Sequence, residues 1–225
     1  QQGAEEGTVV VTEEQAAGRG RLSRGWYFPF GKGLWFSLIL RPDFPPAEAP
    51  KCTLMAAVAL TKAFHKMGLT DAGIKWPNDI LVNGRKLVGI LTEMSGSMEE
   101  ISHIVMGIGV NIKIKQEELP EEIKQIATSL LMEGIEIERT EAFKIILEEL
   151  EHQYYEVLDS GFDDTLNEWR KLSVTLNQEI EVRAPGNTYE GGATDIDNDG
   201  NLLVKTSTGD IKRVVAGDVS IRPRK

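Results

Sequence analysis

The first half of the chain alternates between apolar and polar positions in a way that predicts β-strands. TVVVT at 8–12 and LWFSLIL at 34–40 are short apolar runs typical of buried strands. Two further runs lie within IKWPNDILVNGRKLVGILTEM at 74–94, and the Asn83-Gly84 pair between them strongly favours a two-residue hairpin turn. ISHIVMGIGVNI at 101–112 predicts another strand.

Apolar residues that recur every three or four positions predict three helices before residue 173. Four prolines between positions 42 and 50 break the chain before the first helix, which contains TLMAAVAL and ends at Gly68. A second helix runs from about Thr140 to Asp159, with Gly161 just past its end. A short third helix carries Trp169.

After Ser173 the pattern changes to short strands separated by turn signals. About fifty residues of this kind form a small β-barrel or sandwich. We therefore predict an α/β domain over 1–173, with a mixed sheet and flanking helices, followed by a small all-β domain over 174–225.

The composition is that of a soluble globular protein, with 225 residues of which 41% are hydrophobic and 27% charged. No segment approaches the roughly 18 consecutive apolar residues of a membrane helix, and the first residues do not form a secretory signal. The net charge of −10 argues against general affinity for nucleic acid, because phosphate binding requires a basic face. Cys52 is the only cysteine, which excludes a disulfide framework or cysteine-rich zinc site and predicts a cytoplasmic location.

The segment GRGRLSRGW at 18–26 concentrates positive charge in this acidic chain. Its glycines permit backbone angles closed to other residues, and its arginines offer forked donors suited to carboxylate or phosphate. We expect a loop that is mobile when empty and ordered when an anion binds, with Trp26 stacking on a base or anchoring the loop. The alternatives are a solvated basic loop without a ligand and a nucleic-acid contact, whereas the spacing of a Walker-type phosphate loop is absent.

KWPND at 75–79 brings a cation, an amide and a carboxylate into one short span. Pro77 restricts Trp76 to an extended conformation, so we expect Asn78 and Asp79 to project from a strand entrance. The carboxylate could hold magnesium on a nucleotide or steer an incoming amine. For this segment alone, the simpler alternative is a turn in which Asn78 and Asp79 only satisfy backbone amides.

Two more segments follow the predicted hairpin turn. Arg85-Lys86 places two cations at the start of a strand, where the alternative for Lys86 is an exposed charge that protects a strand edge. GIGVN at 107–111 ends another strand, and its glycines either border a nucleotide site or only mark close packing between strands. Individually, these segments are modest evidence for a ligand site.

Taken together and in this order, GRGRxxRxW, KWPND, RKLxGIL and GIGVN resemble the biotin protein ligase family. The resemblance extends over essentially the whole chain, including the β-rich tail, which is similar to that family's SH3-like C-terminal domain. It implies the class II synthetase-like α/β (α+β) fold of biotin and lipoate ligases. It also implies an ATP-dependent ligase that forms biotinyl-5'-AMP, releases pyrophosphate and passes biotin to one lysine of a biotin carboxyl carrier protein.

The resemblance also assigns roles by motif position. The catalytic residues it implies are Arg21, Lys75, Asp79 and Lys86, with Asp79 as a magnesium ligand or the partner of the acceptor amine. The biotin site it implies comprises Gln15, Arg19, Gly20, Arg21 and Lys86, with Gly89 to Leu91 and Gly107 to Gly109 as pocket walls. The residues implied to hold ATP or the adenylate are Arg24, Trp26, Lys75, Asn78 and Asn111.

The sequence departs from the family pattern at its start. The family's Ser-Thr-Asn segment, which hydrogen-bonds the ureido ring of biotin, would precede these residues, and we expect the natural protein to contain it. No helix-turn-helix precedes the ligase segment, so we predict a ligase that is not a repressor, and a homodimer through the main sheet is usual among relatives. The alternatives are a lipoate or octanoate ligase and a bifunctional ligase-repressor whose DNA-binding part lies outside this sequence.

Overall fold

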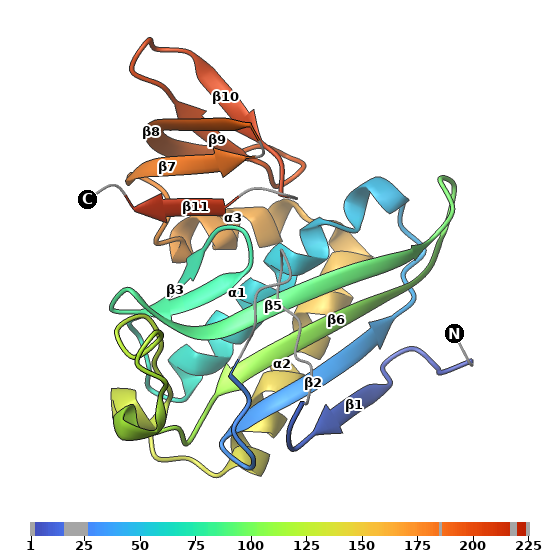
Figure 1. Cartoon of the computed structure of the whole chain (residues 1–225). Helices are drawn as coiled ribbons and strands as arrows, with labels where there is room; N and C mark the ends of the chain where they lie inside the picture. The colour runs from blue at the N-terminus through green and yellow to red at the C-terminus, as the bar shows by residue number, and fades with distance from the viewer. Residues whose placement is uncertain (1–2, 16–26, 185, 217–219, 224–225) are drawn as a thin grey trace.

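The larger of two sheets dominates the structure, a computed structural model that describes residues 3–15, 27–184, 186–216 and 220–223 (Figure 1). Its strands lie in the order β1-β2-β6-β5-β4-β3, and each pair of neighbours is antiparallel. They are β1 (Val9–Thr12), β2 (Gly33–Leu40), β3 (Ala72–Lys75), β4 (Asp79–Val82), β5 (Arg85–Gly96) and β6 (Ile101–Asn111). The sequence predicts a mixed sheet, but within the described ranges the parallel pairing is limited to two isolated bridges, Ile74 to Ser173 and Lys86 to Ala127.

The predicted hairpin is formed by β4 and β5. At its turn Asn83 and Gly84 have φ angles of 50° and 78°. These left-handed values are required by a type I′ turn, and asparagine and glycine adopt them more readily than other residues do. The turn therefore forms where the local sequence predicts it.

Strand β1 differs from the prediction in its burial. The run at 8–12 is predicted to be a buried strand, but the side chains of Val10 and Val11 are 58% and 46% exposed. The reason is topological, because β1 lies at the edge of the sheet and pairs with β2 on one side only among the described strands. A β-branched run predicts a strand, whereas its burial depends on its neighbours.

Helices cover one face of the larger sheet (Figure 1). They are α1 (Lys51–Lys66), α2 (Arg139–Ser160) and α3 (Asp163–Leu172), with short 3-10 helices at η2 (Pro46–Glu48), η3 (Gln116–Glu118) and η4 (Leu131–Glu133). In β6, Ile104, Met106 and Ile108 are buried on the helix side, whereas Gly107 and Gly109 are half-buried on the opposite side. This opposite side is called the open face below.

The C-terminal part forms a second, five-stranded antiparallel sheet in the order β10-β9-β8-β7-β11. Its strands are β7 (Glu179–Ala184), β8 (Asn187–Ile196), β9 (Leu202–Lys205), β10 (Ile211–Val214) and β11 (Ser220–Pro223). The predicted fold class, an α/β part followed by a small all-β part, is confirmed. The boundary after residue 173 stays a prediction, because side chains from both sheets share one hydrophobic core.

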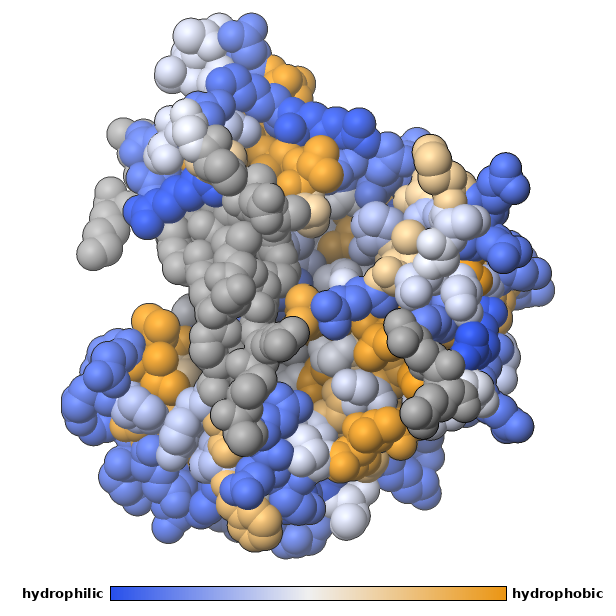
Figure 2. Space-filling view, turned by 45° about the vertical axis from the view of Figure 1, so that its right-hand side comes forward, coloured by the Kyte–Doolittle hydropathy of each residue, from blue (hydrophilic) through white to orange (hydrophobic). Residues whose placement is uncertain are grey.

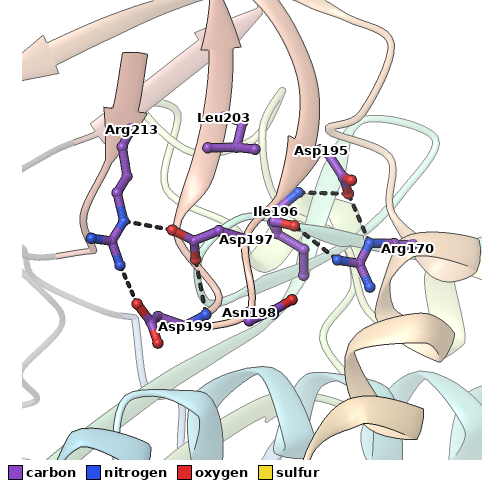
Figure 3. A pocket seen from close by; sticks show the side chains of 8 residues that line it. All are labelled: Arg170, Asp195, Ile196, Asp197, Asn198, Asp199, Leu203 and Arg213. Atoms are coloured by element: carbon purple, nitrogen blue, oxygen red, sulfur yellow. Dashed lines mark hydrogen bonds and ion pairs between the residues drawn. The ribbon is translucent and has the colours of Figure 1, made fainter. Parts of the chain in front are cut away.

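The turn between β8 and β9 joins the two sheets. Three alternate carbonyls, one at the end of β8 and two in this turn, accept hydrogen bonds from the α/β part. Arg170 on α3 donates to Ile196 O (2.8 Å), Lys51 on α1 donates to Asn198 O (3.1 Å), and Trp76 Nε1 donates to Gly200 O (3.1 Å). Figure 3 shows Arg170 reaching this turn, where Nε also binds Asp195 Oδ1 at 2.7 Å.

Asp197 stabilises the same turn from within. Its carboxylate accepts hydrogen bonds from the backbone nitrogen of Asp199 (3.0 Å) and from Arg213, both drawn in Figure 3. It also accepts one from the backbone nitrogen of Asn201 (2.9 Å). Burial acts to raise the pKa of Asp197, but these hydrogen bonds outweigh it and hold the pKa below its usual range. The turn is therefore held both by its own hydrogen bonds and by donors from the α/β part.

The surface turned to the viewer in Figure 2 is mostly hydrophilic, with separate apolar patches. This agrees with a chain of which 27% of the residues are charged. Among the helices of the described ranges, none combines the length and apolar character that a bilayer crossing would require.

Candidate active site

A row of residues in direct cross-strand register crosses the open face of the larger sheet. Lys75 pairs with Asp79, Asp79 with Gly89, Gly89 with Gly109, and Gly109 with Trp35. Directly opposite residues of antiparallel strands lie on the same face of the sheet. The row therefore has a cation and a carboxylate at one end, two residues without side chains at its centre and an indole at the other end.

Gly107 occupies the next row, opposite Ser37 on β2 and Leu91 on β5. A Cβ atom added to Gly107 would lie 3.5 Å from Leu91 O, 3.9 Å from Leu91 Cβ and 4.0 Å from Ser37 Oγ. These are ordinary van der Waals separations, so packing between the strands does not require glycine at this position. The alternative that Gly107 only marks close strand packing is therefore not supported.

A β-bulge places Lys86 on the open face. Ile80 pairs with Val88, whereas the next residue, Leu81, pairs with Lys86, so Leu87 is the extra residue on β5. Without the bulge, strict alternation would turn Lys86 toward the helices together with Val88. The bulge instead brings Lys86 to the side that carries Asp79.

Lys86 and Asp79 form an ion pair, with 2.6 Å between Lys86 Nζ and Asp79 Oδ1. Both side chains are largely buried, at 30% and 21% exposure. Within the described residues Asp79 Oδ1 accepts no hydrogen bond of normal geometry, so this contact is electrostatic rather than an aligned hydrogen bond. The alternative of an edge-protecting lysine is excluded, because β5 lies between β4 and β6 and the segment at 126–128 continues the sheet beside Lys86.

Asn78 ties the start of β4 to β5. Its side-chain Nδ2 donates to Ile90 O at 2.7 Å, and Ile90 N donates to Asn78 O at 2.9 Å. Asn78 is thus a donor to a neighbouring strand, not only a cap for nearby amides. The peptide bond between Trp76 and Pro77 is cis, and Trp76 is buried against the C-terminal sheet.

Asn111 lies at the end of β6 on the open face, and only 4% of it is exposed. Its Nδ2 donates to Thr128 O at 2.8 Å. The structure therefore brings Lys75, Asp79, Lys86, Gly89, Leu91, Gly107 and Asn111 to one face of one sheet. Their catalytic and binding roles stay predictions.

The predicted residues of the arginine loop lie outside the described part of the chain. They are Arg19, Gly20, Arg21, Arg24 and Trp26. The expected ordering of this loop around an anion is therefore a prediction only. Gln15 is described, and it is exposed in the coil that follows β1.

Sequence reasoning missed an aromatic cluster at the far end of the first row. Trp35 is fully buried and packs edge-on against Phe28, with ring centroids 5.0 Å apart. Ile114, Leu119 and Ala127 from the long connection after β6 complete this cluster. The alternation in LWFSLIL could have placed Trp35 and Ser37 on one face, but no local signal indicates that residues beyond 112 fold back over it.

The connection after β6 is also tied down by polar contacts. Tyr27 Oη donates to Glu118 O at 3.1 Å, and Lys32 Nζ lies 2.8 Å from Glu118 Oε1. The hydrogen bond from Lys32 and the backbone hydrogen bond of Lys115 hold the pKa of Glu118 below its usual range. The acid is therefore ionised at neutral pH and fixes the connection to the strand entrance.

In the described ranges, no group of three or more histidine, cysteine, aspartate or glutamate side chains is arranged to hold a metal ion. Asp79 is the one predicted metal ligand, and its Oδ1 lies 2.6 Å from Lys86 Nζ. The protein residues described do not form a metal-binding cage.

Two protein-family models match the chain. The model of the biotin/lipoate A/B protein ligase family matches residues 1–111, and that of the biotin protein ligase C-terminal domain matches residues 175–222. The first covers biotin and lipoate ligases together, whereas the second names biotin protein ligases alone.

Individual relatives give the same result. The bifunctional ligase/repressor BirA of Bacillus subtilis is 40% identical over 219 residues, covering 97% of this chain and 67% of that protein. The biotin–[acetyl-CoA-carboxylase] ligase of Mycobacterium tuberculosis is 32% identical over 220 residues, covering 95% of this chain and 79% of that protein. The solved biotin protein ligase of Aquifex aeolicus in complex with biotin and ATP has a TM-score of 0.85 at 27% identity, covering 98% of this chain and 91% of that one. The chain therefore belongs to the biotin protein ligase family.

Proposed function

We propose that this protein activates biotin with ATP to biotinyl-5'-AMP and pyrophosphate and then transfers biotin to a lysine of a biotin carboxyl carrier protein. The observation that carries the proposal is the Lys86–Asp79 ion pair beside the glycines of the open face. A surface without side chains suits a flat ring system and its aliphatic chain. The lysine ammonium stands at the end of that surface, where a carboxylate would be attracted.

In the first step, a carboxylate oxygen of biotin attacks the α-phosphorus of ATP, and the bond from that phosphorus to pyrophosphate breaks. Both reactants are anions, so positive charge must reduce their repulsion before the new bond forms. Lys86 supplies one such charge and Lys75, in the same row as Asp79, supplies a second. We propose that Arg21 in the arginine loop supplies another, and that Arg19 and Gly20 of this loop contact biotin.

In the second step, the amine of the acceptor lysine attacks the carbonyl carbon of the adenylate. AMP leaves with the electron pair of the broken bond, and the amine loses a proton. Asp79 is the carboxylate at this position, and its Oδ1 accepts no aligned hydrogen bond within the described residues. We propose that Asp79 steers the incoming amine.

Magnesium enters this proposal as the partner of the phosphates of ATP. The described residues provide no group of three ligands for it, so the nucleotide and water must supply most of its coordination. Asp79 can contribute one carboxylate at most. We also propose a cytoplasmic location, which fits the single, buried cysteine.

The test supplies the purified protein with biotin, ATP, magnesium and a biotin carboxyl carrier domain. We expect one biotin on one acceptor lysine, detected by mass spectrometry of the acceptor. Pyrophosphate exchange into ATP isolates the first step, and it is measured with biotin and, in parallel, with lipoate. Exchange that depends on lipoate alone would overturn the proposal in favour of a lipoate ligase, which the relatives do not favour.

Repression is part of the name of the Bacillus subtilis relative. We propose that these 225 residues do not bind DNA themselves, because their net charge of −10 opposes contact with phosphates. Gel-shift experiments at low salt test this point. DNA binding that weakens steeply as salt is added would contradict it.

We propose a homodimer built through the edge of the larger sheet. Strand β1 has one partner among the described strands, and its Val10 and Val11 are exposed. An open edge of this kind can pair with a second copy. Sedimentation should therefore show a dimer that Val10→Lys shifts toward monomer, whereas a monomeric parent protein would contradict the proposal.

A further inference from the structure

We infer that Thr128, held by Glu133, is a positioning residue that fixes both Lys86 and Asn111 for adenylate formation. This inference rests on the proposed function of Lys86 and Asn111. It concerns the segment at 126–130, which no motif of the sequence singles out.

The segment at 126–128 replaces β6 beside the start of β5. Toward the start of β5, pairing with β6 stops at Val88, because β6 ends at Asn111. At Lys86 the partner is instead the segment, with Lys86 N donating to Ile126 O (2.7 Å) and Thr128 N donating to Lys86 O (2.9 Å). Lys86 therefore has both backbone polar groups bound to a segment that lies about forty residues later in the chain.

This support is placed beside the β-bulge. The extra residue Leu87 turns Lys86 to the open face, and a bulge interrupts the regular hydrogen bonding of the strand. The two hydrogen bonds to the segment at 126–128 hold the other edge of β5 at this point, opposite the edge where the bulge disturbs pairing with β4. The direction of the Lys86 side chain toward Asp79 therefore depends on the segment staying in place.

The same segment binds Asn111. Asn111 Nδ2 donates to Thr128 O at 2.8 Å, and Leu130 N donates to Asn111 O at 3.1 Å. Thr128 thus bonds to Lys86 through its backbone nitrogen and to Asn111 through its carbonyl oxygen. One residue connects two predicted site residues that lie on different strands.

Thr128 is itself held by its side chain. It is 1% exposed, and its Oγ1 donates to Glu133 Oε1. The same oxygen accepts a hydrogen bond from Arg85 Nη2 at 2.7 Å, and the Glu133 side chain is 8% exposed. A buried carboxylate with two donors is a strong, directional partner. The hydroxyl of Thr128 therefore fixes the orientation of this residue within the segment.

Positioning of this kind affects rate more than stability. A reacting group displaced by about 1 Å can reduce a rate by roughly 100-fold. The loss of one buried threonine hydrogen bond elsewhere in the protein would alter stability but would not displace Lys86 or Asn111. The inference therefore predicts different results for two otherwise similar substitutions.

The test compares Thr128→Val with Thr128→Ser and with Thr61→Val. Valine preserves the shape of threonine and removes the hydroxyl, whereas serine retains the hydroxyl. Thr61 is a matched control, because it is fully buried in α1 and its Oγ1 donates to Ala57 O at 2.8 Å, away from the open face. Kinetic constants for biotin and ATP are measured by pyrophosphate exchange, and thermal unfolding is recorded for every variant.

We expect Thr128→Val to lower kcat for exchange by about tenfold or more. Thr128→Ser and Thr61→Val should stay within about threefold of the parent. Hydrogen–deuterium exchange of peptides that contain Lys86 should accelerate in Thr128→Val alone. If Thr128→Val fails to fold, Arg85→Met replaces it in the test. This substitution removes the ion pair between the partly exposed Arg85 and Glu133, and it should show the same changes in smaller degree.

Parental kinetics in Thr128→Val, or equal losses in the serine and valine variants, would overturn the inference. A parent protein without exchange activity would overturn the proposed function instead. In that case the hydrogen–deuterium exchange at Lys86 still decides whether Thr128 positions this strand.

Discussion

We predict that Gly107→Ala weakens binding of biotin without lowering the stability of the fold. The substitution places one methyl group on the open face, between Leu91 and Ser37. All three nearest atoms would lie at 3.5–4.0 Å, and Gly107 has no positive φ angle that alanine would resist. The folded protein can therefore accept the methyl group without moving.

The magnitudes follow from these contacts. Replacing glycine by alanine inside a strand stabilises the protein by about 0.5–1 kcal/mol, because the unfolded chain loses freedom. In the proposed complex the same methyl group would take up space that biotin needs. Overfilling a well-packed site costs about 1–3 kcal/mol, which corresponds to roughly a 5- to 150-fold weaker affinity for biotin.

The assay is direct titration of biotin, with urea unfolding of the same preparation. We expect weaker binding of biotin together with an unfolding free energy equal to or slightly above that of the parent. The control is Gly192→Ala in β8, where the nearest atom to the new Cβ is the flexible Glu179 Oε1 at 3.1 Å. Parental affinity for biotin in Gly107→Ala would refute the reasoning, as would a loss of affinity that the control shares.

Three further predictions concern other parts of the molecule. Trp76→Phe removes the donor to Gly200 O and leaves a buried carbonyl without its partner, so urea unfolding should show a loss of about 1–3 kcal/mol, and an unchanged midpoint would contradict this. Lys86→Ala should reduce biotin-dependent pyrophosphate exchange by about 100-fold or more while thermal unfolding shows a folded protein, and full activity would exclude the role of Lys86. Burial raises the pKa of the Cys52 thiol from 9.0 to about 12, so ionisation of the unfolded chain should lower stability between these pH values. Urea unfolding at pH 8 and pH 11 should show that loss reduced in Cys52→Ala, and an equal loss in both proteins would contradict it.

Local signals in the sequence were sufficient to predict much of the sheet. Asn83-Gly84 predicts a turn with two positive φ angles, and both occur. The alternation along 101–112 predicts a strand, and β6 occupies Ile101–Asn111. These predictions succeed because a turn and a strand depend largely on neighbours in sequence.

The direction of Lys86 could not be read from the same alternation. Counting by twos from Gly89 would place Lys86 on the helix side, together with Val88, and away from Asp79. The bulge at Leu87 reverses this, but Leu87 is an ordinary apolar residue that carries no signal for a bulge. Motif resemblance predicts Lys86 as a site residue but does not indicate how the strand presents it.

Contacts between segments far apart in the chain could not be predicted from the sequence either. Thr128 and Glu133 lie in a stretch without regular strand or helix pattern, and their partners on β5 and β6 lie 17 to 48 residues earlier. The exposure of β1 was mispredicted for a related reason. Its sequence is that of a buried strand, but its position in the order of strands determines how much of it is covered.

KWPND illustrates how one short segment serves both parts of the molecule. Lys75 and Asp79 pair across adjacent strands on the open face, whereas Trp76 between them is 1% exposed. Trp76 binds the C-terminal part twice. Its backbone nitrogen donates to Thr175 Oγ1 at 2.9 Å, and its Nε1 donates to Gly200 O at 3.1 Å. The residue that anchors the second sheet is thus covalently next to a predicted catalytic lysine. The β8–β9 turn is therefore joined through Trp76 to the segment that carries Lys75 and Asp79, so we expect substitutions that disturb this turn to reach the open face along this path.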